Sequence, residues 1–206
     1  MRTVDPDRHA RKRARILQAA AAEFAAHGVD GTSTAAVCRR AGIGSGTLFH
    51  YFPTKRDIFH ALFADDVPRH AEACDRALAA ERPDDGLDGL VDHLLADLPD
   101  PLVPGLAAAA FLQANRDEAF ALMVAADEAR IHAALVTLLE RLADEGRPLA
   151  FAPGRAAGWL QRLINAAYLS ADEAGFDPAA HAAELRHIID WLVGRVPAPA
   201  RPEGHT

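Results

Sequence analysis

Cysteine is scarce in this sequence, and long apolar runs are absent. The two cysteines, Cys38 and Cys74, have neither the spacing of a metal site nor that of a redox pair. We therefore expect two free thiols in a reducing compartment. No segment approaches the roughly 20 apolar residues that span a bilayer, and the charged N-terminus has no apolar signal region. These absences predict a soluble, cytoplasmic protein.

Motifs of catalysis and of metal binding are also missing. The sequence has no glycine-rich phosphate loop after a strand, no nucleophile elbow and no carboxylate pair that spacing alone would bring together. The ten histidines include no pair four residues apart with a carboxylate as third ligand, and His181 and His187 face differently. We expect no enzymatic activity, no cofactor and no metal.

Runs of Val, Ile, Thr and Tyr that would form strands are lacking, whereas alanine is abundant and apolar residues recur at helical spacing. This pattern predicts an all-α fold of about nine helices. The length allows one sizeable core or two modest domains. We expect an N-terminal head over residues 1–53, a helical body over residues 54–195 and a disordered tail over residues 196–206.

Charge is distributed unevenly along the chain. Residues 1–60 have a net charge of +5, whereas the remaining residues have a net charge of −12. A basic end on an acidic body orients a protein on nucleic acid, because phosphates attract one part and repel the other. A basic run near the N-terminus is either solvated or in contact with phosphate: Arg8, Arg11, Lys12, Arg13 and Arg15.

The most specific pattern of the chain lies in residues 32–57. A short helix over about 33–40 is followed by Gly42, where the chain must turn through a conformation that only glycine adopts cheaply. A second short helix, about 45–51, leaves small polar and aromatic residues on its outer side. This is the pattern of a helix-turn-helix, whose second helix enters the DNA major groove, and Gly46 permits the close approach.

This stretch, together with the run from Ile16 to Phe24 and Gly28, resembles the DNA-binding head of the TetR-type (TetR/AcrR) transcriptional regulators over about 45 residues. The apolar anchors, the Ala-Gly turn, the Gly-Thr-Leu-aromatic run and the Phe-Pro-Thr-Lys ending recur at the spacing of that family. The resemblance implies that phosphates or bases are contacted by residues in and beside the second helix: Thr32, Ser33, Ser45, Gly46, Thr47, His50, Tyr51 and Lys55.

Two positions depart from the family pattern. Gly44 stands where the family usually has a capping serine, and Phe49 stands where it usually has a tyrosine that bonds a phosphate. Losing a hydrogen bond to a charged group costs about 1.5–3 kcal/mol. Affinity for a half-site is then either lower or restored elsewhere, for example by the N-terminal arginines.

The body begins with a helix that Thr54 and Asp57 start as a capping box. Pro68 should bend this helix near residues 64–67, which makes the bend either a hinge between head and body or a local break. The remaining helices are expected at residues 86–98, at 102–113, from the cap at Asn115 to about 144, at 154–174 and at 178–195. Asn115 with Glu118 should cap the third of these.

The last two helices carry wide apolar stripes that one small body cannot cover, so we expect them to form a four-helix bundle with a second copy across a two-fold axis. The family resemblance implies the same homodimer. The predicted interface residues are Leu160, Leu163, Ile164, Ala167, Leu185, Ile188, Ile189 and Leu192.

The resemblance also implies a ligand cavity in the body. Its candidate residues are large or polar side chains on the body helices: Phe63, His70, Phe111, Gln113, Met123, Trp159, Arg162, Asn165 and Tyr168. For the aromatics and Met123, ordinary core packing is the competing interpretation. Arg162 and Asn165 are more suggestive, because polar groups on an apolar helix need partners when they are buried.

Together these features predict a homodimeric transcriptional regulator that binds a palindromic double-stranded DNA operator and responds to an unknown small-molecule effector, more in the manner of a repressor than of an activator. Two alternatives stay open. One is a DNA-binding protein without an effector, and the other is a helical sensor or scaffold that has lost specific DNA binding.

Overall fold

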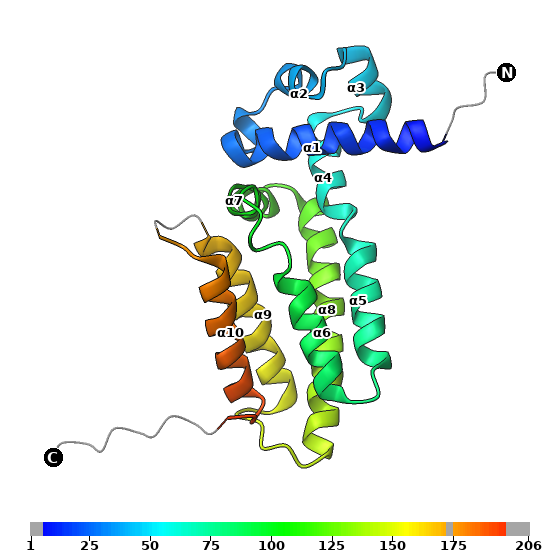
Figure 1. The fold of residues 1–206 in the computed structure, drawn as a ribbon. Helices are drawn as coiled ribbons and strands as arrows, with labels where there is room; N and C mark the ends of the chain where they lie inside the picture. The colour runs from blue at the N-terminus through cyan, green and yellow to red at the C-terminus, as the bar shows by residue number, and fades with distance from the viewer. Residues whose placement is uncertain (1–5, 172–174, 197–206) are drawn as a thin grey trace.

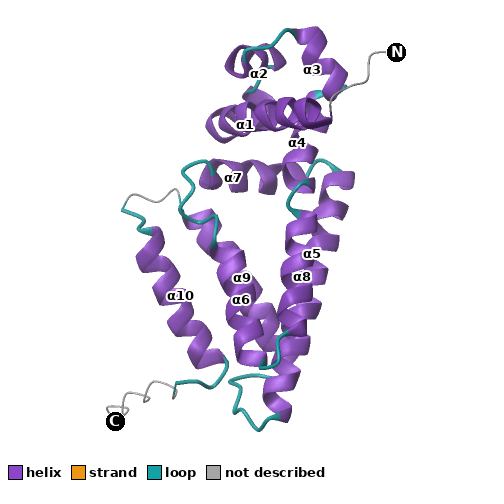
Figure 2. Ribbon diagram, turned by 45° about the vertical axis from the view of Figure 1, so that its right-hand side comes forward, coloured by secondary structure: helices purple, strands orange, loops and turns teal. Residues whose placement is uncertain are grey.

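The computed structural model describes residues 6–171 and 175–196, and these residues form helices joined by loops, without strands (Figures 1 and 2). This confirms the all-α prediction. The helices are α1 (Pro6–Gly31), α2 (Thr34–Ala41), α3 (Ser45–Tyr51), α4 (Lys55–Ala64), α5 (Val67–Ala79), α6 (Pro83–Leu95), α7 (Val103–Ala114), α8 (Glu118–Asp144), α9 (Pro153–Ser170) and α10 (Pro178–Leu192).

The head is a small three-helix unit in which α2 and α3 lie over α1 (Figure 1). Gly28 interrupts α1 with a φ of 66°, and Gly42 ends α2 in the left-handed conformation with a φ of 62°. The turn at Gly42 occurs where the sequence predicted it, and a side chain at either position would be strained. Ile16 and Phe24 of α1 and Leu48 of α3 are fully buried between the three helices.

The helix expected to bend at Pro68 is instead two helices. α4 begins with the predicted capping box, since the Thr54 hydroxyl accepts from Asp57 N and the Asp57 carboxylate accepts from Thr54 N. It ends at Ala64, and α5 starts at Val67 with Pro68 in its first turn. A proline fits there because first-turn N–H groups have no partner within the helix. This break accounts for ten helices in the described residues, against about nine expected.

α7 lies crosswise between the head and the long body helices (Figures 1 and 2). It crosses α1 at Gly105, where an added Cβ atom would be 2.2 Å from the Ala25 carbonyl oxygen. Only glycine permits such a close approach of two main chains. Gly105 therefore sets how closely the head sits on the body.

Two hydrophobic clusters form the interior. The first cluster contains side chains of α1, α2, α3 and α4, together with Ala109 of α7 and Phe120 of α8. It therefore extends across the predicted domain boundary between residues 53 and 54. The second holds α5, α6, α8, α9 and α10 together. Cys38 belongs to the first cluster and Cys74 to the second; both thiols are free, as predicted. In the part of the chain described, no helix has the length and apolar character needed to cross a bilayer.

Some sequence-based boundaries were wrong. α6 begins at Pro83, three residues before the expected start, because proline suits the first turn of a helix. The cap of α8 is Asp117, whose carboxylate accepts from Phe120 N, whereas Asn115 donates its side-chain amide to Phe111 O. Asp177 caps α10 by accepting from Ala179 N and Ala180 N. Residues 197–206 of the predicted tail lie outside the described residues.

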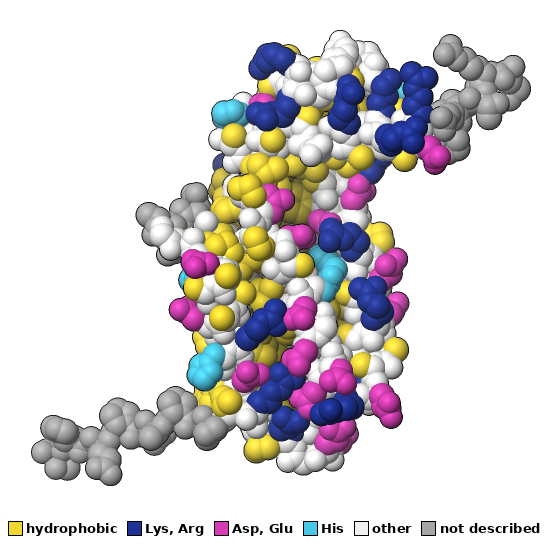
Figure 3. All heavy atoms as spheres, viewed as in Figure 1, with side chains coloured by type: hydrophobic (Ala, Val, Ile, Leu, Met, Phe, Trp, Pro, Cys, Tyr) yellow, Lys and Arg dark blue, Asp and Glu magenta, His cyan; other side chains and the backbone are white. Residues whose placement is uncertain are grey.

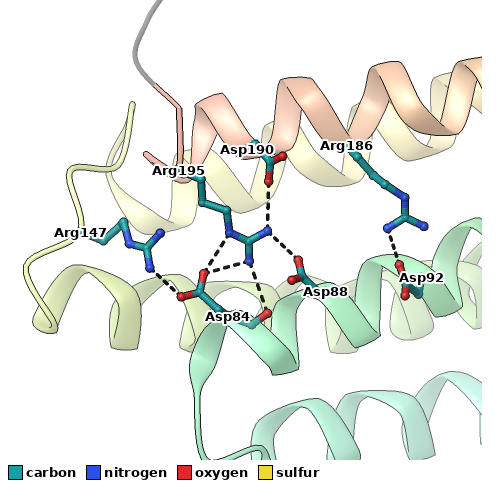
Figure 4. A network of polar contacts seen from close by, with 7 residues as sticks. All are labelled: Asp84, Asp88, Asp92, Arg147, Arg186, Asp190 and Arg195. Atoms are coloured by element: carbon teal, nitrogen blue, oxygen red, sulfur yellow. Dashed lines mark hydrogen bonds and ion pairs between the residues drawn. The ribbon is translucent and has the colours of Figure 1, made fainter.

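Ion pairs fasten the C-terminal end of α10 to the start of α6 (Figure 4). Arg195, three residues past α10, reaches Asp84 at 2.9 Å, Asp88 at 2.7 Å and Asp190 at 3.0 Å. Arg147, from the loop between α8 and α9, reaches the other oxygen of Asp84 at 2.6 Å. One arginine shared among three carboxylates is held more firmly than an isolated surface pair, which typically contributes about 0–1 kcal/mol.

Replacing Gly86 by alanine should destabilise the protein by about 1–3 kcal/mol. A Cβ atom at this position would be 2.3 Å from the Ala77 carbonyl oxygen and 2.9 Å from Leu138 Cδ2. The matched control is Gly89→Ala in the same helix, since nothing lies within 4 Å of its added Cβ and alanine is the better helix former by about 0.5–1 kcal/mol. Urea unfolding of both variants checks this, and equal stabilities would contradict the close packing of α5, α6 and α8.

Candidate nucleic-acid interface and body cavity

The outer surface of α3 matches the sequence-based expectation. Ser45, Gly46 and His50 are exposed, and Thr47 and Tyr51 are half-buried. Nothing lies within 4 Å of the Cβ position of Gly46. The first turn of α3 can therefore approach another surface closely, and its hydroxyl and imidazole groups are available to hydrogen-bond acceptors and donors there.

The two positions that depart from the family pattern both lie on this surface. Gly44 occupies the cap position of α3 with a φ of −83°, and α3 has no side-chain cap. Phe49 is 47% exposed, which is unusual for a phenyl ring on a short surface helix. Its ring offers apolar contact, for example with a thymine methyl group, where a tyrosine would offer a hydroxyl.

Residues flanking the two helices have different roles. Ser33 is exposed and caps α2. Thr32, by contrast, is buried, and its hydroxyl lies 2.8 Å from Gly28 O and 3.0 Å from Glu23 O. Its side chain therefore holds the α1–α2 turn. Lys55 donates to Thr32 O at 2.8 Å, so its ammonium group braces the same turn while staying partly exposed.

An aromatic group at the edge of α3 includes a residue that the sequence analysis missed. The ring of Tyr51 lies 4.4 Å from that of His9 on α1 and 5.5 Å from that of His50. His9 is exposed beside the outer surface of α3. No spacing rule could have found it, because the packing of α1 on α3 brings together residues far apart in the sequence.

The basic run of α1 is partly engaged within the chain. Arg13 donates to Asp65 at 2.5 and 2.8 Å and lies over the ring of Phe52, and Arg15 donates to Gly42 O at 3.1 Å. These two arginines thus hold α1 to the rest of the protein. Space-filling shows Lys and Arg side chains gathered over the head, with acidic side chains frequent over the body (Figure 3).

A cavity of about 320 Å³ lies in the body, beneath the head. It is lined by residues from α4 to α9, most of them apolar. Five of the nine candidate ligand residues line it: Phe63, His70, Met123, Asn165 and Tyr168.

The other four candidates lie elsewhere. Phe111 is 62% exposed, and Gln113 donates to Asp117 at 3.3 Å. Trp159 and Arg162 stack on each other at 5.6 Å on the surface of α9, beside a different depression. Helical periodicity groups residues on a face, but it does not say which face turns inward.

The polar groups of the cavity centre on Asp127. One of its oxygens lies 2.5 Å from His70 Nδ1, and the other is buried without a hydrogen-bond partner. The ring of His93 lies 5.4 Å from that of His70, and burial, followed by the charge of His70, lowers the pKa of His93. The Tyr168 hydroxyl donates to Leu94 O at 2.6 Å, and burial raises its pKa to about 12.

Sequence reasoning missed Asp127 and Glu128, although a signal was present. Met123, Asp127 and Ile131 follow one another at intervals of four residues on α8, and all three line the cavity. A residue four positions from a lining residue shares its face. Choosing Met123 should therefore have selected Asp127 too.

Residues 16–62 match the model of the bacterial regulatory proteins of the tetR family. Over 95 residues the chain is also 30% identical to the HTH-type transcriptional repressor AcnR of Corynebacterium glutamicum. The N-terminal head is therefore a DNA-binding head of the TetR type. The match to AcnR covers 46% of this chain and 45% of AcnR, so it spans less than half of that relative.

Solved structures agree with the TetR-family fold over nearly the whole chain. A transcriptional regulator of Pseudomonas aeruginosa PAO1 superposes with a TM-score of 0.71 at 22% identity, covering 92% of both chains. A TetR transcription regulator of Haloarcula marismortui gives 0.73 at 18% identity, covering 89% of this chain and 97% of the other. GusR of Salmonella enterica superposes with a TM-score of 0.64 at 24% identity, covering 88% of this chain and 95% of GusR. At sequence identities this low, the structural similarity establishes a shared fold alone.

The residues predicted for a TetR-family dimer interface lie mostly inside the chain. Leu163 and Ile188 reach the surface. The other six are buried in the chain's own second cluster, because the apolar stripes of α9 and α10 pack on each other and on the helices behind them: Leu160, Ile164, Ala167, Leu185, Ile189 and Leu192. Those six side chains are not available to a second copy.

Proposed function

We propose that this chain is a ligand-responsive transcriptional repressor of the TetR family. A homodimer binds a palindromic operator, with half-sites about one helical turn apart, and a small molecule in the body cavity releases it. The observation that carries the proposal is one continuous aromatic core between the cavity and the recognition head. AcnR, the relative that matches the N-terminal part, is a repressor, which favours repression over activation.

The coupling runs through α4. Phe63 lines the cavity, and its ring lies 5.1 Å from those of Phe59 and Phe120. Phe59 in turn lies 5.2 Å from Phe24 of α1, edge to face. Close-packed side chains transmit displacement. A ligand that moves Phe63 would therefore shift α1 and the helices above it, and effector binding would change the spacing of two heads in a dimer.

Homodimer formation is supported by apolar side chains that stay exposed on one chain. Five of them lie on α7, α9 and α10: Phe111, Leu112, Trp159, Leu169 and Ile188. Each is between 37% and 62% exposed. Large apolar surface gathered on neighbouring helices is typical of an interaction site, and a two-fold axis through α9 and α10 would cover it.

The decisive experiment is selection of binding sites from a random DNA pool, followed by gel shifts. The double variant Thr47→Ala/His50→Ala should bind the selected duplex at least about tenfold more weakly, because base contacts typically contribute about 1–3 kcal/mol each. His50 is exposed and Thr47 is only half-buried, so the melting temperature of the double variant should stay near that of the wild type. The matched control is Thr137→Ala on the body, which should bind as the wild type does.

The outcomes separate the remaining alternatives. No enrichment of a sequence, with salt-sensitive binding to all duplexes, would favour a DNA-binding protein without a defined operator. No DNA binding by a folded dimer would favour a sensor or scaffold, consistent with the changes at Gly44 and Phe49. Undiminished binding by the double variant would contradict the placement of α3 in the groove.

A further inference from the structure

Carboxylates dominate the charge of the body cavity. Four acidic side chains line it: Asp66, Asp97, Asp127 and Glu128. His70 is the one basic lining residue in the part of the chain described. Arg69, behind the wall, lies 2.9 Å from Asp66 and 3.9 Å from Asp97. Even with Arg69 and a protonated His70 counted, the site has a net charge of −2.

The carboxylate of Asp127 has unused capacity for a cation. The second oxygen of Asp127 is buried and has no partner, although a carboxylate normally accepts several hydrogen bonds. Burial raises the pKa of Asp66, and the charge of Arg69, which donates to it at 2.9 Å, acts in the opposite direction. Burial also disfavours a charged His93, so that ring adds little positive charge beside His70.

The rest of the wall determines what kind of cation fits. Apart from the acids, His70 and Asn165, it consists of aliphatic side chains, Met123 and two aromatic rings, those of Phe63 and Tyr168. Aromatic faces attract organic cations, and a volume of about 320 Å³ is at the small end of ligand pockets. Among the described residues, no three His, Cys, Asp or Glu side chains are placed to hold a metal ion.

We propose that the cavity binds a small organic cation, an amine with an apolar or aromatic body, whose ammonium group donates to Asp127 and lies near Glu128. The apolar body packs against Phe63 and Met123. This inference rests on the proposed function for its regulatory meaning, but the binding itself is independent of DNA. Anionic molecules are disfavoured, because the wall would repel them and leave the buried Asp127 oxygen without a donor.

The test compares three molecules with one carbon skeleton: phenylbutylamine, phenylbutanol and phenylbutyrate. Calorimetric titration of the full chain at neutral pH should find the amine bound at least about tenfold more tightly than the alcohol, with the carboxylate weakest. Asp127→Asn and Glu128→Gln keep the side-chain shapes and should weaken amine binding by about tenfold each without changing alcohol binding. Glu140→Gln, exposed on the same helix, is the matched control.

Three results would overturn the proposal: equal affinity for the three molecules, preference for the carboxylate, or no amine binding up to its solubility limit. Zinc chloride alone is the fourth arm, and stoichiometric zinc binding that Asp127→Asn abolishes would make the ligand a metal instead. Amine binding that leaves DNA retention unchanged would support the cavity inference and contradict the ligand response. Specific DNA binding without amine binding would contradict the cavity inference and leave the DNA-binding part of the proposed function standing.

Discussion

Replacing Gly105 by alanine should lower the free energy of unfolding by about 1–3 kcal/mol and weaken DNA binding at the same time. The added Cβ atom would lie 2.2 Å from Ala25 O and 2.8 Å from Ala25 Cα. Main-chain atoms cannot rotate away as a side chain can, so α7 and α1 must separate. The clash exceeds the gain of about 1 kcal/mol that alanine brings to a helix.

Two further variants isolate this effect. Gly89→Ala adds a methyl group to a helix without any contact, so it should leave the melting temperature and DNA retention unchanged or slightly improved. Ala25→Gly should fail to rescue Gly105→Ala, because the atoms in conflict belong to the main chain. At this chain length each kcal/mol shifts the melting temperature by about 2–4 °C. A Gly105→Ala protein with wild-type stability would show that α1 and α7 do not cross this closely in solution.

The head could be read from the sequence because its signals are local. Gly42 needs a positive φ, and Thr54 with Asp57 closes a capping box within four residues, so each position determines its own turn. The same holds for Asp177 at the start of α10. Such signals require no knowledge of what packs against the helix.

The body could be read only in part, because its site depends on how helices are rotated and crossed. Asn165 and Arg162 are three residues apart on α9, yet Asn165 faces the cavity and Arg162 faces outward. Leu160 and Ile164 fitted an interface stripe as well as a core stripe, and the structure uses them in the core. The crossing at Gly105 was not foreseeable either, since a glycine within a helical stretch does not indicate which helix packs against it.

The start of α8 shows why one cap was chosen over another. Asn115 and Asp117 are both good cap residues. The Asp117 carboxylate, however, also accepts two hydrogen bonds from Arg56 and lies 2.7 Å from His60 Nε2, and both partners belong to α4. Its side chain is 97% buried. A carboxylate with two basic partners on a neighbouring helix is held by tertiary contacts, which a cap rule does not include. Asp117 thereby ties α4, next to the head, to α8 of the body.

Replacing Asp117 by asparagine should make stability less dependent on pH in acid. The hydrogen bonds from Arg56, and after them those from His60, hold the pKa of Asp117 far below its ordinary value of 3.8. A lowered folded-state pKa contributes stability that is present above the unfolded value and is lost as pH falls towards the folded one. The wild type should therefore exceed Asp117→Asn in stability at neutral pH, and this difference should shrink between about pH 5 and pH 2.

The matched control is Asp177→Asn, because Asp177 caps α10 through backbone N–H groups and has no ion pair within the described residues. Asparagine keeps the capping geometry in both variants, so only the Asp117 variant loses a charge that Arg56 and His60 share. Urea unfolding from neutral to acid pH measures both. A stability difference for Asp117→Asn that stays constant across the range would mean that capping, and not the charge linking α4 to α8, makes Asp117 important.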